Sequence, residues 1–280
     1  MFRRRALLAA PGLLLAPQAR AQQRPLRIIT PFATGGATDA LARIVGARIT
    51  ALTVQAVVVE AKPGAGGDLA MQAGAAAEPD GHTLILGSDS SLVRNPMLRR
   101  TIPYDPERDF APIARLVTSW YAIAVNAAVP ARTVAEFFAW ARANPGRVNY
   151  GSAGPGTLAH VIGEMMSQGQ RLDMQHVPYR GANPALQDLV AGRLQFYAVS
   201  AGGLLPLLRD GSVRVLAVTG PSRQPGMPGV PTIAEAGFAE YDHSAFYSLS
   251  APARVAPALV DQTGALLGRI MAEAETSERL

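Results

Sequence analysis

The sequence predicts an α/β protein with two lobes, each a mainly parallel sheet flanked by helices. Two observations support this. Short β-rich apolar runs alternate with amphipathic helical patterns along most of the chain, which is typical of strand–loop–helix units. A glycine-rich junction between a strand and a helix also occurs twice, at 30–43 and at 149–160. One such junction in each half of the chain indicates two lobes of the same kind.

The first α/β series lies between residues 26 and 91. The runs 26–32, 54–61 and 83–91 are predicted to be strands, and the last of them ends in a polar loop. The segments between these strands have helical periodicity. The first helix carries apolar residues on one face, at Leu41, Ile44, Val45 and Ile49.

The second series follows a looser stretch and closes with a helix at roughly 255–272. Strand-like connectors near 118–126 and 243–251 predict that the chain passes between the lobes twice. We therefore assign lobe 1 to residues 22–122 plus 246–280 and lobe 2 to residues 123–245.

The first 21 residues are predicted to be a secretory signal peptide. Arg3, Arg4 and Arg5 precede a short apolar run. Small residues, Ala19 and Ala21, stand at positions −3 and −1 of the expected cleavage site. The run is shorter than the ~20 residues that a membrane span needs. We expect cleavage before Gln22 and export to the periplasm.

Composition excludes several classes of site. Four arginines, Arg3, Arg4, Arg5 and Arg20, leave with the signal peptide, so the expected mature chain has 22 basic and 21 acidic residues. It shows no basic run with interleaved aromatic residues, so no nucleic-acid partner is expected. The absence of cysteine excludes disulfides and thiolate metal sites.

The two glycine-rich junctions predict an anion site. Each places glycines and a threonine, Thr38 or Thr157, at the start of a helix, where the threonine can cap the helix or present a hydroxyl beside free N–H groups. Helix N-termini from two lobes that face one cleft would bind an anion. Ordinary strand-to-helix turns are the alternative. A loose dinucleotide fingerprint at 154–159, with Asp173 downstream, leaves a phosphate ligand open, whereas export favours a carboxylate.

Catalytic chemistry is hard to assemble from these residues. The serines at 88, 90 and 91 lack a G-x-S-x-G frame. Ser152, His160 and Asp173 can be drawn as a triad, but a loop donor and a helix residue explain the first two more simply. No histidine pair has metal-ligand spacing. We expect no catalysis, no metal and no cofactor; the alternatives are an exported α/β hydrolase-like enzyme and a ligand sensor that signals to a membrane kinase.

Several segments, in order, resemble those of the Bug-type receptors of tripartite tricarboxylate transporters. The resemblance covers the chain from about residue 26. The matching segments are PFATGGATDALAR, VVVEAKPGAGGDLA, PDGHTLILGS, PYDPERDFAPIARL, NYGSAGPGTLAH, HVPYRGANPALQDLVAGR and RVLAVTG with PGVPTIAEAG.

The resemblance implies a two-lobed periplasmic binding protein of type II, a Venus flytrap. Such a receptor captures a small organic carboxylate between its lobes and delivers it to integral-membrane permease subunits, and we expect it to be a monomer. In the family, ligand carboxylates are held by backbone amides, hydroxyls and waters rather than by arginines. The positions that match the ligand loops are Phe32, Thr34, Gly35, Gly36, Ala37, Gly66, Gly67, Ser88, Asp89, Ser90, Ser152, Ala153, Gly156, Thr157, His160, Tyr179 and Gly181.

Three residues and the end of the chain bear on how closely the chain follows the family pattern. Asp39 matches the family's acidic residue at the helix start, where it complements the helix dipole. Thr34 replaces a proline or alanine and adds a hydroxyl. Ser200, in the segment 196–202, is the nearest substitute for an aspartate that the family often has. The chain also stops at Leu280, where relatives usually continue, so a truncated lobe 1 is expected.

Overall fold

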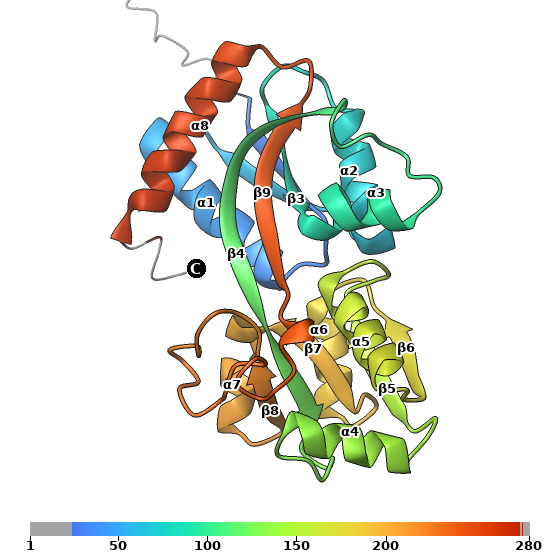
Figure 1. Cartoon of the computed structure of the whole chain (residues 1–280). Helices are drawn as coiled ribbons and strands as arrows, with labels where there is room; N and C mark the ends of the chain where they lie inside the picture. The colour runs from blue at the N-terminus through green and yellow to red at the C-terminus, as the bar shows by residue number, and fades with distance from the viewer. Residues whose placement is uncertain (1–23, 275, 277–280) are drawn as a thin grey trace, which may run out of the picture.

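The chain forms two lobes that are joined by two long neighbouring strands (Figure 1). The structure, a computed structural model, describes residues 24–274 and 276. The predicted signal peptide and its cleavage site lie outside the described residues. In the part of the chain that is described, no helix combines the length and the apolar character needed to cross a membrane.

Lobe 1 is a mixed five-stranded sheet with helices on it. Its strands run in the order β2-β1-β3-β9-β4, with β1, β2 and β3 parallel and β9 antiparallel to both β3 and β4. The elements are β1 (Leu26–Thr30), α1 (Ala37–Thr53), β2 (Val57–Ala61), η1 (Ala65–Gly67), α2 (Asp68–Ala75), β3 (Thr83–Ser88), η2 (Ser90–Arg94), α3 (Asn95–Leu98), β4 (Phe110–Asn126), β9 (Ser244–Pro252) and α8 (Pro257–Ala272).

Lobe 2 repeats this plan. Strand β5 pairs in parallel with β6 and β7, and the second half of β4 pairs antiparallel with β7 and β8. Its elements are α4 (Val134–Ala143), β5 (Val148–Ser152), α5 (Leu158–Gly169), β6 (Met174–Pro178), α6 (Ala182–Val190), β7 (Phe196–Ser200), η3 (Ala201–Leu204), α7 (Leu205–Arg209), β8 (Val213–Val218) and η4 (Ala239–Tyr241).

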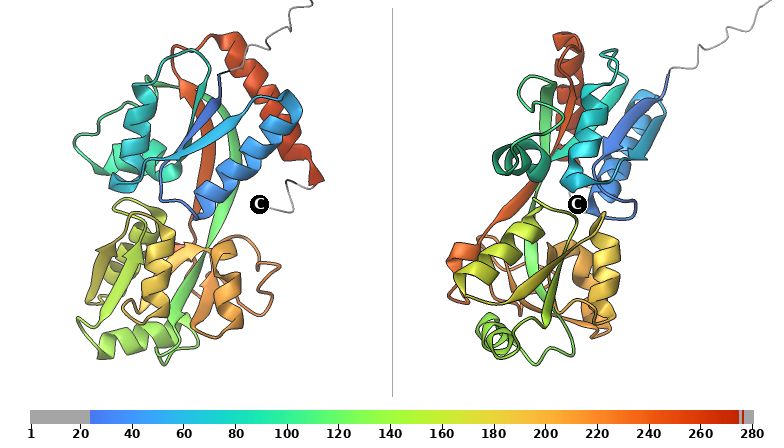
Figure 2. Two further views of the ribbon diagram at one scale, coloured as in Figure 1. Left: turned by 180° about the vertical axis from the view of Figure 1, so that it is seen from behind. Right: turned by 90° about the vertical axis from the view of Figure 1, so that its right-hand side faces the viewer.

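Strands β4 and β9 are the connectors between the lobes, and they run side by side along the molecule in both views (Figure 2). Residues 110–120 of β4 pair with β9, and residues 121–126 pair with β7 and β8. Because β4 passes from one sheet to the other without a break, the boundaries that we assigned at 122/123 and 245/246 stay predictions.

Each lobe has its own apolar core. In lobe 1, the predicted face of α1 packs with α8: Leu41, Val45 and Ile49 share a cluster with Leu267 and Ile270. In lobe 2, the helices pack on both faces of the sheet around residues such as Phe137 and Tyr197. The strand that we predicted to begin at residue 54 begins only at Val57, because Val54 has φ +62° and ends α1.

Candidate functional site

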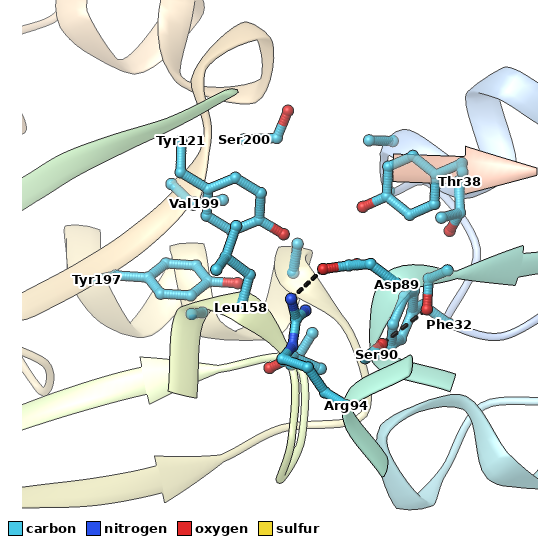
Figure 3. A pocket seen from close by; sticks show the side chains of 18 residues that line it. Phe32, Thr38, Asp89, Ser90, Arg94, Tyr121, Leu158, Tyr197, Val199 and Ser200 are labelled. Atoms are coloured by element: carbon cyan, nitrogen blue, oxygen red, sulfur yellow. Dashed lines mark hydrogen bonds and ion pairs between the residues drawn. The ribbon is translucent and has the colours of Figure 1, made fainter. Parts of the chain in front are cut away.

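A cavity lies between the two lobes, and both lobes and both connecting strands contribute to its wall (Figure 3). Its volume is about 50 Å³, and one water needs about 10–15 Å³ on the same measure. It adjoins a larger pocket of about 480 Å³, and the two share Gly36, Ala37, Ala182, Val199, Ser200 and Tyr247 in their walls. The wall consists of Phe32, Gly36, Ala37, Thr38, Ser88, Asp89, Ser90, Arg94, Tyr121, Ala153, Thr157, Leu158, Ala159, Ala182, Tyr197, Val199, Ser200 and Tyr247.

Two helix N-termini from opposite lobes face this cavity. The N-cap and the first residues of α1, Gly36–Thr38, line it from lobe 1, and those of α5, Thr157–Ala159, line it from lobe 2. The first N–H groups of a helix have no partner within the helix. No side chain caps either helix. The cavity therefore has two uncapped, electropositive helix ends in its wall, as the two glycine-rich junctions predict.

In lobe 1, Asp39 shapes the junction from behind. Its Oδ2 accepts a hydrogen bond from Gly35 N at 3.0 Å and one from Arg43 Nε at 2.9 Å. The Arg43 hydrogen bond lowers the pKa of Asp39, with the Gly35 amide contributing and burial opposing. Asp39 does not line the cavity, so it holds the turn and complements the dipole rather than contacting a bound molecule.

In lobe 2, side-chain hydrogen bonds fix the junction before α5. Gly154 N donates to Ser152 Oγ at 3.1 Å, and Thr157 Oγ1 donates to Gly154 O at 2.7 Å. Thr157 stands at the N-cap position of α5, but its hydroxyl donates to Gly154 O and accepts no hydrogen bond from the N–H groups of the helix. Thr38 lies within α1 and does not cap it either. Capping was therefore the wrong role for both threonines, which instead form part of the cavity wall.

Three tyrosines in the wall were missed by the sequence reasoning. Tyr121 and Tyr247 stand on the connecting strands β4 and β9, and Tyr197 stands on β7. Burial raises the pKa of all three, that of Tyr247 to about 12, so their hydroxyls keep their protons and can donate to an anion. For Tyr121 and Tyr247, the available signal was their position on predicted connectors, which must pass the cleft.

The wall also contains an ion pair. Asp89, directly after β3, pairs with Arg94 at the end of η2, and the side chains are 8% and 19% exposed. Burial raises the pKa of Asp89, while the Arg94 guanidinium opposes the rise. Arg94 Nε also donates to Gly156 O in the other lobe at 3.0 Å. The resemblance implied a site without arginine, and this chain places one in the cavity wall.

The structure brings together about half of the predicted ligand residues. Those in the wall are Phe32, Gly36, Ala37, Ser88, Asp89, Ser90, Ala153, Thr157 and Ser200. Those that lie outside it are Thr34, Gly35, Asp39, Gly66, Gly67, Ser152, Gly156, His160, Tyr179 and Gly181.

Several of the outlying residues support the wall from behind. Gly66 O accepts hydrogen bonds from Ser90 Oγ and Asn95 Nδ2, both at 3.3 Å. Gly181 allows close approach of the lobes, because a Cβ there would lie 3.2 Å from Ala33 N. Tyr179 points elsewhere, since its hydroxyl donates to Asp188 Oδ2 at 2.6 Å.

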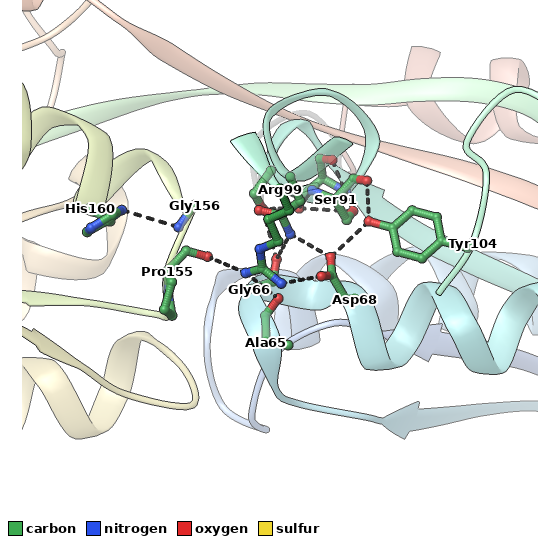
Figure 4. Close-up of polar contacts among 12 residues, drawn as sticks. Ala65, Gly66, Asp68, Ser91, Arg99, Tyr104, Pro155, Gly156 and His160 are labelled. Atoms are coloured by element: carbon green, nitrogen blue, oxygen red, sulfur yellow. Dashed lines mark hydrogen bonds and ion pairs between the residues drawn. The ribbon is translucent and has the colours of Figure 1, made fainter. Parts of the chain in front are cut away.

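A second polar network, around Arg99, joins the lobes beside the cavity (Figure 4). Arg99 pairs with the buried Asp68, and its Nη2 donates to Ala65 O and, across the gap, to Pro155 O, both at 3.1 Å. Asp68 Oδ1 also accepts from Tyr104 Oη at 2.9 Å. Together with the bond from Arg94 to Gly156 O, these contacts hold the glycine loop of lobe 2 against lobe 1.

Ser152, which the sequence allows to be drawn in a triad with His160 and Asp173, contacts a different histidine. Ser152 Oγ lies 2.6 Å from His176 Nε2, and the rings of His176 and His160 lie 4.2 Å apart. Asp173 instead lies at the Gly146 turn, where its carbonyl accepts from Gly146 N. The structure therefore does not group Ser152 with His160 and Asp173 as a triad, in line with the simpler roles expected from the sequence. Ser152 is fully buried and does not line the cavity.

The His176 cluster makes stability depend on pH. Burial lowers the pKa of His176 to about 4, and His160 contributes. The ordinary value is about 6.5, so between these two pH values the unfolded chain binds more protons and stability falls as pH falls. We expect the melting temperature to fall between pH 7 and pH 4.5, and His176→Gln to reduce this fall. Thermal melts of the parent and the variant across that range test this, and an unchanged profile for His176→Gln would contradict the assignment.

Among the described residues, no group of three or more histidine or acidic side chains is placed to hold a metal ion.

Comparison with known proteins shows the family. Residues 41–276 match the model of the family described as "Tripartite tricarboxylate transporter family receptor". A UPF0065 protein of Bordetella bronchiseptica is 37% identical over 237 residues, which are 83% of this chain and 70% of that protein.

Solved structures agree over most of the chain. The MatC protein of Rhodopseudomonas palustris with bound malate has a TM-score of 0.87 at 30% identity, covering 92% of this chain and 88% of that one. A second R. palustris protein, Rpa4515 with adipate, has a TM-score of 0.88 at 30% identity, with coverage of 92% and 86%. Fold, cavity and relatives agree, and the chain belongs to the tripartite tricarboxylate transporter receptor family.

Proposed function

We propose that this chain is an extracytoplasmic receptor that captures a small organic carboxylate between its lobes and delivers it to the permease subunits of a tripartite tricarboxylate transporter. The observation that carries the proposal is the pair of uncapped helix N-termini, those of α1 and α5, that face one cavity from opposite lobes. Free amides and the positive ends of two helix dipoles favour an anion there.

A carboxylate fits this cavity better than a nucleotide does. Two similar proteins of known structure were solved with carboxylates, one with malate and one with adipate. Hydroxyl donors from Ser90, Tyr121 and Tyr247 stand in the same wall. The dinucleotide-like segment 154–159 forms the turn before α5 and its first two residues, and the turn contacts lobe 1 through the Arg94 and Arg99 bonds.

The Ser152–His176 contact is explained more simply by a structural role in a binding protein than by catalysis. The serine hydroxyl accepts a hydrogen bond from Gly154 N within its own loop. A nucleophile must reach its substrate, and Ser152 is buried behind the wall. We therefore assign this pair to the support of the glycine loop.

We expect small carboxylates to raise the melting temperature of the purified protein, whereas NAD and ATP do not. A ligand at about a hundred times its dissociation constant stabilises the folded state by about 2.7 kcal/mol. Thermal shift measurements with a panel of mono-, di- and tricarboxylates, amino acids and nucleotides test this, after dialysis to remove any bound molecule. Stabilisation by a nucleotide and by no carboxylate would overturn the proposal.

A further inference from the structure

We infer that the Asp89–Arg94 ion pair adapts this cavity to an α-amino acid with an uncharged side chain, a ligand with one carboxylate and one ammonium group, in preference to a dicarboxylate. This inference rests on the proposed function, because it assigns a ligand class to the same cavity. The relatives solved with malate and adipate hold dicarboxylates, so the inference separates this chain from them.

The first step is the charge of the cavity. Among the described residues that line it, Asp89 and Arg94 are the only ones with charged side chains. They pair with each other, so the wall has no net side-chain charge. A dicarboxylate would bring its second negative charge beside the buried Asp89 carboxylate, and like charges that lie close together in a site of low dielectric repel each other strongly. A zwitterion adds no net charge.

The second step is the hydrogen-bonding capacity of the pair. The Asp89 carboxylate accepts from Arg94 and from the backbone amides of Ser90 and Asp89. An ionised carboxylate has about four acceptor sites, so Asp89 can also accept from a ligand ammonium group. Arg94 uses Nε on Gly156 O and Nη1 on Asp89. A guanidinium has five N–H groups, so others remain for a ligand carboxylate, in addition to the amides at the two helix ends.

The third step is the remainder of the wall, which indicates the side chain of the ligand. It is formed largely by Phe32, Leu158 and Val199 and by the three tyrosines. Asp89 is the only acidic side chain in the described part of the wall, and its charge disfavours a second ligand carboxylate beside it. The pocket therefore suits an amino acid with an apolar or polar uncharged side chain.

Calorimetry with matched ligand pairs tests the inference on the unmodified protein. The pairs are L-leucine with 4-methylpentanoate and L-phenylalanine with 3-phenylpropanoate, which differ by the ammonium group, and malate and adipate are measured beside them. We expect at least one amino acid to bind ten times or more tighter than its deaminated partner and than both dicarboxylates. Equal or tighter binding of the deaminated acids or of the dicarboxylates overturns the inference and leaves the proposed function standing. Binding of none of these probes, nor of any carboxylate in the wider panel, overturns both.

A near-isosteric variant assigns the effect to the ion pair. Asp89→Asn removes the acceptor charge and releases Arg94, so we expect the amino-acid preference to fall at least tenfold while malate binds as well or better. The matched control is Asp188→Asn, since Asp188 also pairs with an arginine five residues on, Arg193, but lies outside the cavity. An unchanged preference in Asp89→Asn overturns the assignment. If that variant does not fold, the ligand pairs on the unmodified protein still decide the ligand class.

Discussion

Replacing Gly156 by alanine is expected to weaken ligand binding at least 100-fold, equivalent to about 2.7 kcal/mol. Gly156 has φ +82°, and an added Cβ would lie 2.1 Å from Asn95 Oδ1 in the opposite lobe. A left-handed conformation costs a non-glycine residue about 1–2 kcal/mol. Asn95 cannot move away cheaply, because its amide is buried and donates to Asp68 Oδ1 at 2.6 Å. The lobes would therefore be held apart at the cavity.

Calorimetry with whichever carboxylate stabilises the parent protein measures this effect, and circular dichroism checks that both lobes remain folded. The control is Gly229→Ala, because no atom lies within 4 Å of the Cβ that it would add. Parent-like affinity in Gly156→Ala would show that close approach at this loop is not needed for binding.

Replacing Arg99 by alanine is expected to destabilise the protein by about 3 kcal/mol, since it removes the partner of a buried carboxylate. The side chain of Asp68 is 4% exposed, so the variant leaves a largely desolvated carboxylate without its charged partner. The hydrogen bonds to Ala65 O and Pro155 O are lost as well. The melting temperature should fall by about 6–12 °C for a chain of this size.

Chemical denaturation of Arg99→Ala beside Arg108→Ala tests the reason. Arg108 pairs with Asp109 at the surface, where its side chain is 77% exposed, and such a pair contributes less than about 1 kcal/mol. Similar losses in the two variants would show that the burial of Asp68 is not the cause.

The sequence reasoning treated the two glycine loops as equivalent, and the structure separates them. Gly36 has φ −85°, which other residues adopt, and the nearest atom to an added Cβ is 3.7 Å away. A substitution there would act only by filling the cavity. Gly156 is restricted by its own backbone and by the opposite lobe. The amino-acid sequence alone cannot show this difference, because it depends on the φ angle of the glycine and on the residues that the turn packs against.

The alternation of strands and helices, the two glycine-rich helix starts and the two crossing segments were determined by the sequence alone. These features are local. The spacing of apolar residues along the sequence follows the face that each helix or strand buries, and glycine marks the turns. The site could be predicted as far as these junctions reach, which includes Gly36, Ala37 and Thr157.

Only the tertiary structure decided which distant side chains complete the site. Arg94 donates a hydrogen bond to Gly156 O, 62 positions further along the chain. The hydroxyl of Ser152 contacts His176, which no sequence motif indicated. Tyr247 reaches the cavity from the part of β9 that pairs with β4, and Tyr121 reaches it from the point where β4 leaves β9 and pairs with β7. Such contacts are set by the way the lobes pack on each other, and this packing is a sum of many weak, long-range contacts that no short stretch of sequence contains.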